Sequence, residues 1–129
     1  MPTPREWYDT ACEHDRAGRE AEAVPYYLGA IALGLEGEAL RGAYLGLGST
    51  YRTLGRYVES LATFDEALKK FPSANELKVF RAMALYNLGR SKEAVAALLA
   101  VLAATSNDDS ITQYKRAMAL YAEDLDRRW

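Results

Sequence analysis

Apolar residues recur with helical spacing through the middle of the chain, over residues 42–72. Leu61, Phe64 and Leu68 stand three and four positions apart, which places them on one side of a helix. A similar apolar face runs through 42–54, and Gly55 lies between the two stretches, where a tight turn favours glycine. Pro72 ends the second stretch, because proline does not continue a helix. The pattern predicts a helical hairpin.

The segments on either side of this hairpin are weaker copies of it. The turn glycines Gly18, Gly55 and Gly89 are separated by 55 − 18 = 37 and 89 − 55 = 34 residues, an interval typical of helical repeat arrays. The hexapeptide Arg-Ala-Met-Ala-Leu-Tyr occurs at 81–86 and again at 116–121, 116 − 81 = 35 residues further on. The chain is therefore predicted to be all-α, with three helical hairpins followed by the first half of a fourth.

Seven helices follow from this pattern. Thr3 with Glu6, and Ser73 with Glu76, have the spacing of a capping box and predict where the first and fifth helices begin. Pro25 lies inside the second helix and removes a backbone hydrogen bond, so we expect that helix to begin late or to bend. The sixth helix is apolar on nearly all sides, so it must be covered by other parts of the chain. We expect the seventh helix to cover it as a terminal cap. The expected helices span residues 4–17, 20–33, 38–54, 57–70, 74–88, 91–104 and 109–126.

This pattern resembles the tetratricopeptide repeat (TPR) family, whose unit is about 34 residues of helix, turn and helix. The matching residues are Tyr44, Leu47, Gly48, Tyr51, Gly55, Tyr57, Phe64, Ala67 and Pro72 in the middle hairpin, Trp7, Ala11, Gly18, Ala23, Tyr27 and Ala30 in the first, and Ala82, Leu85, Gly89, Ala94 and Leu98 in the third. The resemblance implies one domain over 1–129, a right-handed α-α superhelix with repeats at about 4–37, 38–73 and 74–107 and a capping helix at about 109–126. The chain is also similar to small bacterial single-domain members of this family.

Small residues recur where the TPR pattern brings the two helices of a hairpin close together. Gly48 stands at this place in the middle hairpin, and Ala11, Ala82 and Ala117 stand at the equivalent places. A large side chain at position 48 is therefore expected to overpack the hairpin and to cost roughly 1–3 kcal/mol. The chain departs from the family pattern at His14, Lys78 and Ser60, where the family has tyrosine, an aromatic residue and alanine.

Composition and charge exclude several classes of protein. The 129 residues are 50% hydrophobic and 26% charged, with a formal net charge of −2 and basic residues scattered among acidic ones, so no basic face for nucleic acid is expected. No run approaches the roughly 18 apolar residues of a membrane span, and the N-terminus lacks the pattern of a secretory signal. The single cysteine, Cys12, fits a reducing compartment, and we expect the protein in the cytoplasm.

Residues that carry chemistry are sparse. Cys12 and His14 are the only cysteine and histidine, and two residues apart on a helix they point to different faces. The stretch 46–50 lacks the lysine of a phosphate loop, and Tyr51 stands where a dinucleotide motif needs its last glycine. The sequence therefore predicts no catalytic residue, no metal and no cofactor, and a protein that is not an enzyme.

In the TPR family, the first helix of each hairpin lines a concave groove that holds a protein segment. The Lys and Asn clamp of chaperone-binding members is missing from the matching positions. A helix or extended peptide with apolar anchors is the expected ligand, with Arg16 and Arg52 available for an acidic group. The resemblance assigns partner binding to Tyr8, Arg16, Leu45, Ser49, Arg52, Val79, Met83, Tyr86, Asn87, Tyr114, Met118 and Tyr121.

The expected function is an adaptor or scaffold that binds a protein or peptide in this groove, without a nucleic-acid or membrane partner. Tyr, Met and Arg, which are enriched in protein interfaces, support this reading. Two alternatives stay open. In one, Met83, Met118 and Tyr121 only pack the end of a short solenoid. In the other, the apolar flank of the last helices, with Trp129, forms a homodimer, and the protein is a self-assembling structural protein without a peptide ligand.

Overall fold

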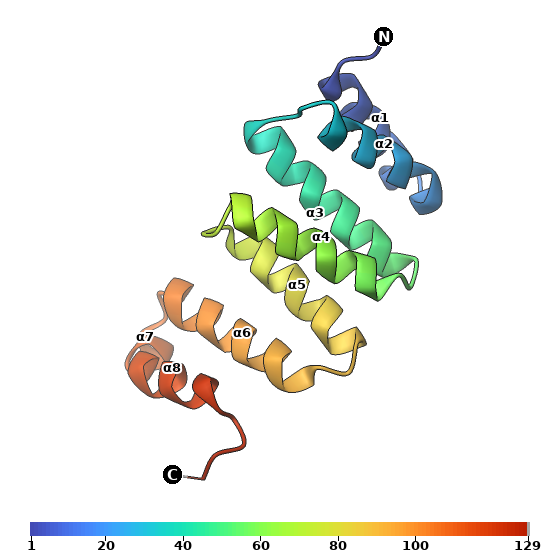
Figure 1. Cartoon of the computed structure of the whole chain (residues 1–129). Helices are drawn as coiled ribbons and strands as arrows, with labels where there is room; N and C mark the ends of the chain where they lie inside the picture. Colours follow the sequence, from blue (N-terminus) through green and yellow to red (C-terminus); the bar gives the residue numbers. More distant parts are fainter. Residues whose placement is uncertain (129) are drawn as a thin grey trace.

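The computed structural model describes residues 1–128, and all regular secondary structure in this range is helical. Trp129 lies outside the described residues. Figure 1 shows the helices following one another as neighbours from the N-terminus to the C-terminus. Their bounds are α1 Pro4–Arg16, α2 Glu20–Ala32, α3 Gly37–Thr53, α4 Tyr57–Lys70, α5 Asn75–Asn87, α6 Ser91–Thr105, α7 Asp109–Thr112 and α8 Lys115–Glu123.

The last predicted helix, 109–126, is two helices, so the expected total of seven was wrong for the described chain. α7 ends at Thr112, and the turn through Gln113 and Tyr114 separates it from α8. Tyr114 is 59% exposed, so packing does not hold this stretch in a helix, and short helices without packing are marginal. The first six helices begin and end within one residue of the predicted positions.

The sequence predicted the starts of α1 and α2 at the observed residues. Thr3 Oγ1 accepts a hydrogen bond from the Glu6 amide at 3.1 Å, and the Thr3 amide donates to the Glu6 carboxylate at 3.4 Å, which completes the capping box. α2 begins at Glu20 and contains Pro25, so of the two effects expected of this proline the late start is excluded. Tyr27, buried two residues further along, anchors the helix through tertiary packing, which offsets the missing hydrogen bond.

The capping box predicted for α5 was also wrong. Ala74 is the residue that precedes the helix, and no side chain caps it. Glu76 instead accepts two hydrogen bonds from the guanidinium of Arg41 on α3, at 2.5 and 2.6 Å. A bidentate, charge-assisted pair of this kind is stronger than a neutral capping bond, and here it ties α3 to α5.

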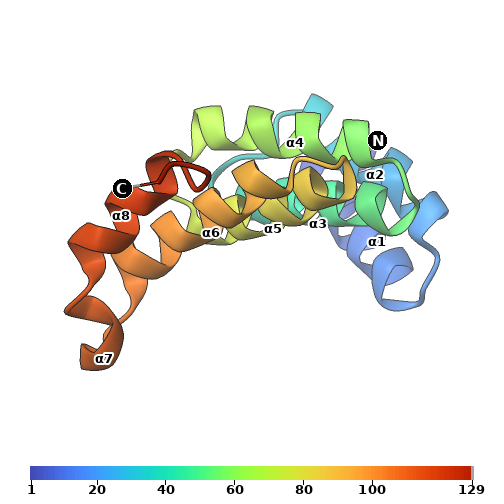
Figure 2. The ribbon, with the colours of Figure 1, turned by 90° about the horizontal axis from the view of Figure 1, so that it is seen from below.

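The hairpins stack mainly through the second helix of one and the first helix of the next, because α2 packs against α3 and α4 against α5, while the contacts between first helices are smaller. α1 pairs with α2, α3 with α4 and α5 with α6, while α1 also contacts α3 and α3 contacts α5. Figure 2 shows α1, α3 and α5 lying beneath α4 as one layer, which we call the inner-helix face. α8 packs against α6, but it makes no comparable contact with α5.

The contact between α3 and α4 depends on Gly48. A Cβ atom added to Gly48 would lie 2.5–2.7 Å from three ring atoms of Phe64, which is fully buried. Ser60, the departure from the family's alanine, is buried and donates its hydroxyl to the Gly48 carbonyl at 2.7 Å, so its polar atom is satisfied. The predicted close approach at position 48 is therefore present in the structure.

Candidate binding groove

The predicted binding residues of α1 and α3 are only partly accessible. Tyr8 is half-buried, with its ring 6.3 Å from that of Tyr27. Burial raises the pKa of the Tyr8 phenol, and the neighbouring Cys12 thiol raises it further. Arg16 is exposed, and Leu45 and Ser49 are half-buried.

Two of the predicted residues bind each other. The Arg52 Nε atom donates to Asn87 Oδ1 at 2.7 Å, which joins α3 to α5. Both side chains are half-buried. Part of the donor capacity of Arg52 is thus used within the chain, which leaves less of it for the acidic group expected on a ligand.

The structure divides the remaining predicted residues between two places. On α5, Val79 and Met83 are half-buried, and Tyr86 is 65% exposed. The others lie at the end of the chain that packs on α6 rather than on α5, and they are Tyr114, Met118 and Tyr121. Of these two groups, only Met83 and Tyr86 line an apolar cavity together.

An apolar cavity of about 340 Å³ opens between α5 and α6, beside Tyr86. Val95 and Leu98 of α6 lie along it with 46% and 42% of their surface exposed. Exposed apolar recesses of this kind mark interaction sites more often than single exposed side chains do. We call it the α5–α6 groove, and its lining residues are Arg52, Ala82, Met83, Tyr86, Ser91, Ala94, Val95 and Leu98.

Sequence reasoning placed Arg52, Met83 and Tyr86 in a binding surface but missed Val95 and Leu98. The signal for them was the apolar character of 91–104, which predicted a cover on more than one side of this helix. The seventh predicted helix was expected to supply the cover. Although α8 does pack on α6, none of its residues lines the groove, so the cover is incomplete.

Charged side chains near the start of α6 pair with one another. Arg90 donates to both carboxylate oxygens of Glu93, at 2.8 and 2.7 Å, and this pair holds the pKa of the Glu93 carboxyl below its ordinary value. The Lys92 ammonium lies 2.9 Å from the carboxylates of Asp124 and Asp126, which raise its pKa. The charged groups at this end are therefore paired within the chain, and the groove itself offers an apolar surface.

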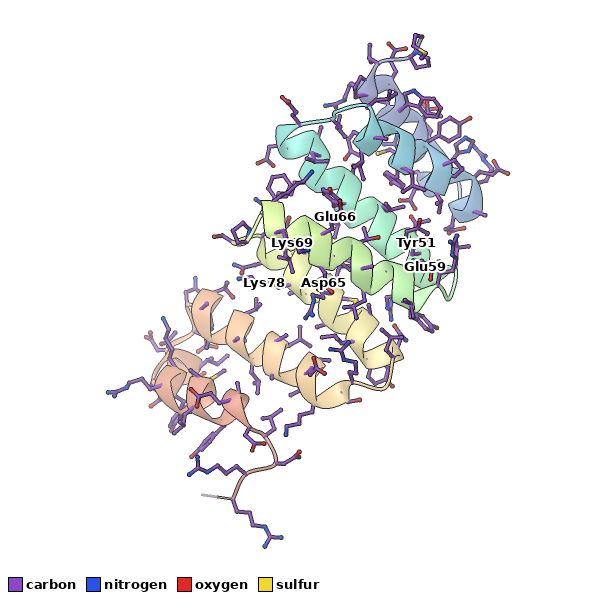
Figure 3. All side chains as sticks on the ribbon, viewed as in Figure 1. Tyr51, Glu59, Asp65, Glu66, Lys69 and Lys78 are labelled. Carbon is purple, nitrogen blue, oxygen red and sulfur yellow. The ribbon has the colours of Figure 1, made fainter. Side chains whose placement is uncertain are left out.

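A second cavity, of about 370 Å³, lies between α4 and α6 over another face of α5, and it is more polar. Figure 3 labels Asp65 and Lys78 beside it. Arg81 Nε donates to Asp65 Oδ1 at 2.6 Å. Lys78 and Arg81 stand where the middle hairpin has Tyr44 and Leu47, so the surface is charged where the middle hairpin is apolar. The α5–α6 groove is the stronger candidate site.

Within residues 1–128, no group of three or more His, Cys, Asp or Glu side chains is placed to hold a metal ion. None of the helices in this range is long and apolar enough to cross a membrane.

Stacked antiparallel helical hairpins with an open apolar groove define a helical repeat protein. The chain belongs to the tetratricopeptide repeat family, because the sequence model of that family, described as a tetratrico peptide repeat, matches residues 4–125. Domains of this family bind proteins and peptides and are typically non-enzymatic. No curated protein matches the chain.

Proposed function

We propose that this protein is an interaction module that holds an apolar helical segment of another polypeptide in the α5–α6 groove. The observation that carries the proposal is that Tyr86, Val95 and Leu98, all large and exposed, line one recess. Membership of a family that binds proteins supports the general role. The proposal assigns no catalytic step to the chain, and it places the protein in the cytoplasm, where Cys12 stays reduced.

A helix is the ligand that the groove fits best. The groove lies between two packed helices, and a third helix packs into such a recess by placing side chains three and four positions apart between the existing ridges. Met83 adapts its shape to different apolar partners, and Tyr86 offers a large contact area with few torsions to order. Covering the exposed half of Val95 or Leu98 contributes on the order of 1 kcal/mol each.

The predicted residues nearer the N-terminus extend the proposed surface. Leu45 and Ser49 lie on α3, and Tyr8 lies on α1, which contacts α3. A longer bound segment would run from the groove along these helices, and the exposed Arg16 at the far end would then meet an acidic residue of the ligand.

Two tyrosine variants test the proposal. Tyr86→Ala removes a groove side chain that is 65% exposed, and Tyr114→Ala removes one that is 59% exposed and lies outside the groove, so neither change empties a core. Proteins enriched on the wild type from source cells are identified by quantitative mass spectrometry, purified and titrated by calorimetry. We expect Tyr86→Ala to weaken binding about tenfold or more, as for an interface anchor, and Tyr114→Ala to leave it unchanged. Equal affinities for all three proteins would overturn the proposal.

A further inference from the structure

The repeated hexapeptide Arg-Ala-Met-Ala-Leu-Tyr packs differently in its two copies. In α5, Ala82, Ala84 and Leu85 are buried, with at most 1% of their surface exposed. In α8, no residue is buried, and Leu120, the counterpart of Leu85, is 43% exposed. Ala119, the counterpart of Ala84, is exposed as well. The side of α5 that carries Ala84 and Leu85 is thus core, whereas the equivalent side of α8, with Ala119 and Leu120, faces solvent.

The surface of α4 that packs against Ala84 and Leu85 has a counterpart on α6, and this counterpart is exposed. Leu61 of α4 belongs to the same buried cluster as Ala84 and Leu85 of α5. Val95 follows Leu61 by 95 − 61 = 34 residues, one repeat later, and it is 46% exposed in the α5–α6 groove. One chain therefore exposes the α5–α6 groove and also exposes the hexapeptide of α8. The other copy of this hexapeptide, in α5, covers the equivalent surface of α4.

We propose that the α5–α6 groove takes the hexapeptide of α8 from a second copy of this chain, and that two copies exchange α8 reciprocally in a two-fold dimer. The inference rests on the proposed function, because it names the helix that the groove holds. The packing of Ala84 and Leu85 against Leu61 would then recur one repeat later, between Ala119 and Leu120 of one copy and Val95 of the other, while each α8 keeps its contact with its own α6. In a pair of copies, each groove is covered by the α8 of the other copy, so both exposed surfaces are buried at once. This is the condition for a closed, self-complementary dimer.

The contacts of α8 within its own chain favour exchange with a second copy over docking in its own groove. The half-buried members of α8, Ala117, Met118 and Ala122, mark the side that packs on α6. Lys92 fixes the following turn through Asp124 and Asp126, both at 2.9 Å. Because α8 is held in this way, the side with Ala119 and Leu120 does not reach the groove of its own chain. Both surfaces are then available to a second molecule.

Charge complementarity supports an antiparallel fit, the direction in which α5 follows α4 (Figure 1). α8 begins with Lys115 and Arg116 and ends at Glu123. α6 has Lys92 at its start, and Asp108 lies just after its end. Antiparallel packing places the basic end of α8 beside Asp108, and it places Glu123 at the start of α6, where the positive end of the helix dipole favours a carboxylate. The reverse direction would bring like charges together.

The size of the contact predicts a modest affinity. α8 has 9 residues, so it is about 14 Å long, and one such helix buries a small area. Reciprocal exchange doubles that area. A dimer that forms in the micromolar range, rather than a permanent one, is therefore expected.

Sedimentation equilibrium over a range of concentrations tests the dimer. We expect the wild type to approach twice the monomer mass, and Val95→Glu and Leu120→Glu to remain monomers at every concentration. Val58→Glu is the matched control, because Val58 is 67% exposed on α4 outside the groove, and it should dimerise like the wild type. Circular dichroism checks that all variants stay folded, which their exposed positions favour. A wild type that stays monomeric, or a Val95→Glu variant that still dimerises, overturns the proposal.

Disulfide trapping tells which copy supplies the helix. In a Cys12→Ser background, a chain with Val95→Cys is mixed with a differently tagged chain with Ala119→Cys, at positions equivalent to Leu61 and Ala84. We expect a mixed disulfide dimer, and crosslinked dimers when both changes are in one chain. An internal disulfide in a monomer would mean that α8 docks in its own groove and would contradict the exchange. If no dimer forms while Tyr86→Ala still loses a captured protein, this inference fails and the proposed function stands.

Discussion

Gly48→Ala adds a single methyl group at the contact between α3 and α4. The new Cβ atom would lie 2.5 Å from one atom of the Phe64 ring and 2.7 Å from two others, whereas ordinary contacts begin at 3.4 Å. The ring must therefore retreat by several tenths of an ångström or more, and it is fully buried. Overpacking of this kind costs roughly 1–3 kcal/mol. The change from glycine to alanine inside a helix recovers about 1 kcal/mol of helix propensity.

Gly29→Ala is the matched control, because it gains the same propensity in α2. A Cβ atom at Gly29 would lie 3.0–3.3 Å from the ring of Trp7, which is only half-buried and is able to shift. Gly48→Ala should therefore be less stable than Gly29→Ala by at least about 1 kcal/mol, or roughly 3–6 °C in thermal unfolding followed by circular dichroism. Phe64→Leu shortens the clashing side chain, so Gly48→Ala should cost less in that background. A Gly48→Ala variant as stable as Gly29→Ala would show that the helix register is wrong.

Three further predictions concern polar contacts that fix the helices. Glu76→Gln should lower the melting temperature slightly by weakening the pair with Arg41. Because Arg41 lowers the pKa of Glu76 from the ordinary value of 4.5, the pair stabilises the fold above that pH and loses this effect as the pH falls. The melting temperatures of wild type and variant should therefore become equal in acid. Tyr27→Phe removes the hydrogen bond to Asp15 (2.8 Å) and should cost about 1 kcal/mol in urea unfolding. Burial and Asp15 raise the pKa of Tyr27 from 10.0, so the wild type's advantage over the variant should be full below pH 10 and shrink above it. Thr3→Ala removes the cap of α1 and should cost about 1 kcal/mol, whereas an unchanged urea midpoint would show that this cap does not support the fold.

The positions of the first six helices could be predicted because their signals are local. Gly18, Gly55 and Gly89 have φ angles of 75°, 76° and 78°, a left-handed conformation that glycine adopts without strain. Their spacing therefore located the turn of each hairpin. The i, i+3, i+7 stripe of Leu61, Phe64 and Leu68 likewise located α4, which spans Tyr57–Lys70 as expected.

The parts that could not be predicted depend on contacts between distant residues. Glu76 has the spacing of a capping residue, but Arg41, 35 positions earlier, binds it. The hexapeptide at 116–121 has the same letters as 81–86, yet α5 packs between α4 and α6, whereas α8 packs mainly against α6. Leu85 and Leu120 therefore differ in burial although their local sequences agree. For the same reason, the exposure of Val95, and with it the groove, followed only from the tertiary structure.

The three methionines of the chain allow one measurement of the account's central claim, that the α5–α6 groove is the surface through which this protein binds a helix. Met83 lies in the groove, Met118 lies in α8, and Met1 is fully exposed far from both. In protein labelled with ¹³C in the methionine methyl groups, NMR spectra are recorded from micromolar to millimolar concentration. We predict that the Met83 and Met118 signals move together while Met1 stays in place, and that Val95→Glu abolishes the movement. A Met83 signal that stays fixed at every concentration, and also when a captured partner is added, would contradict the claim.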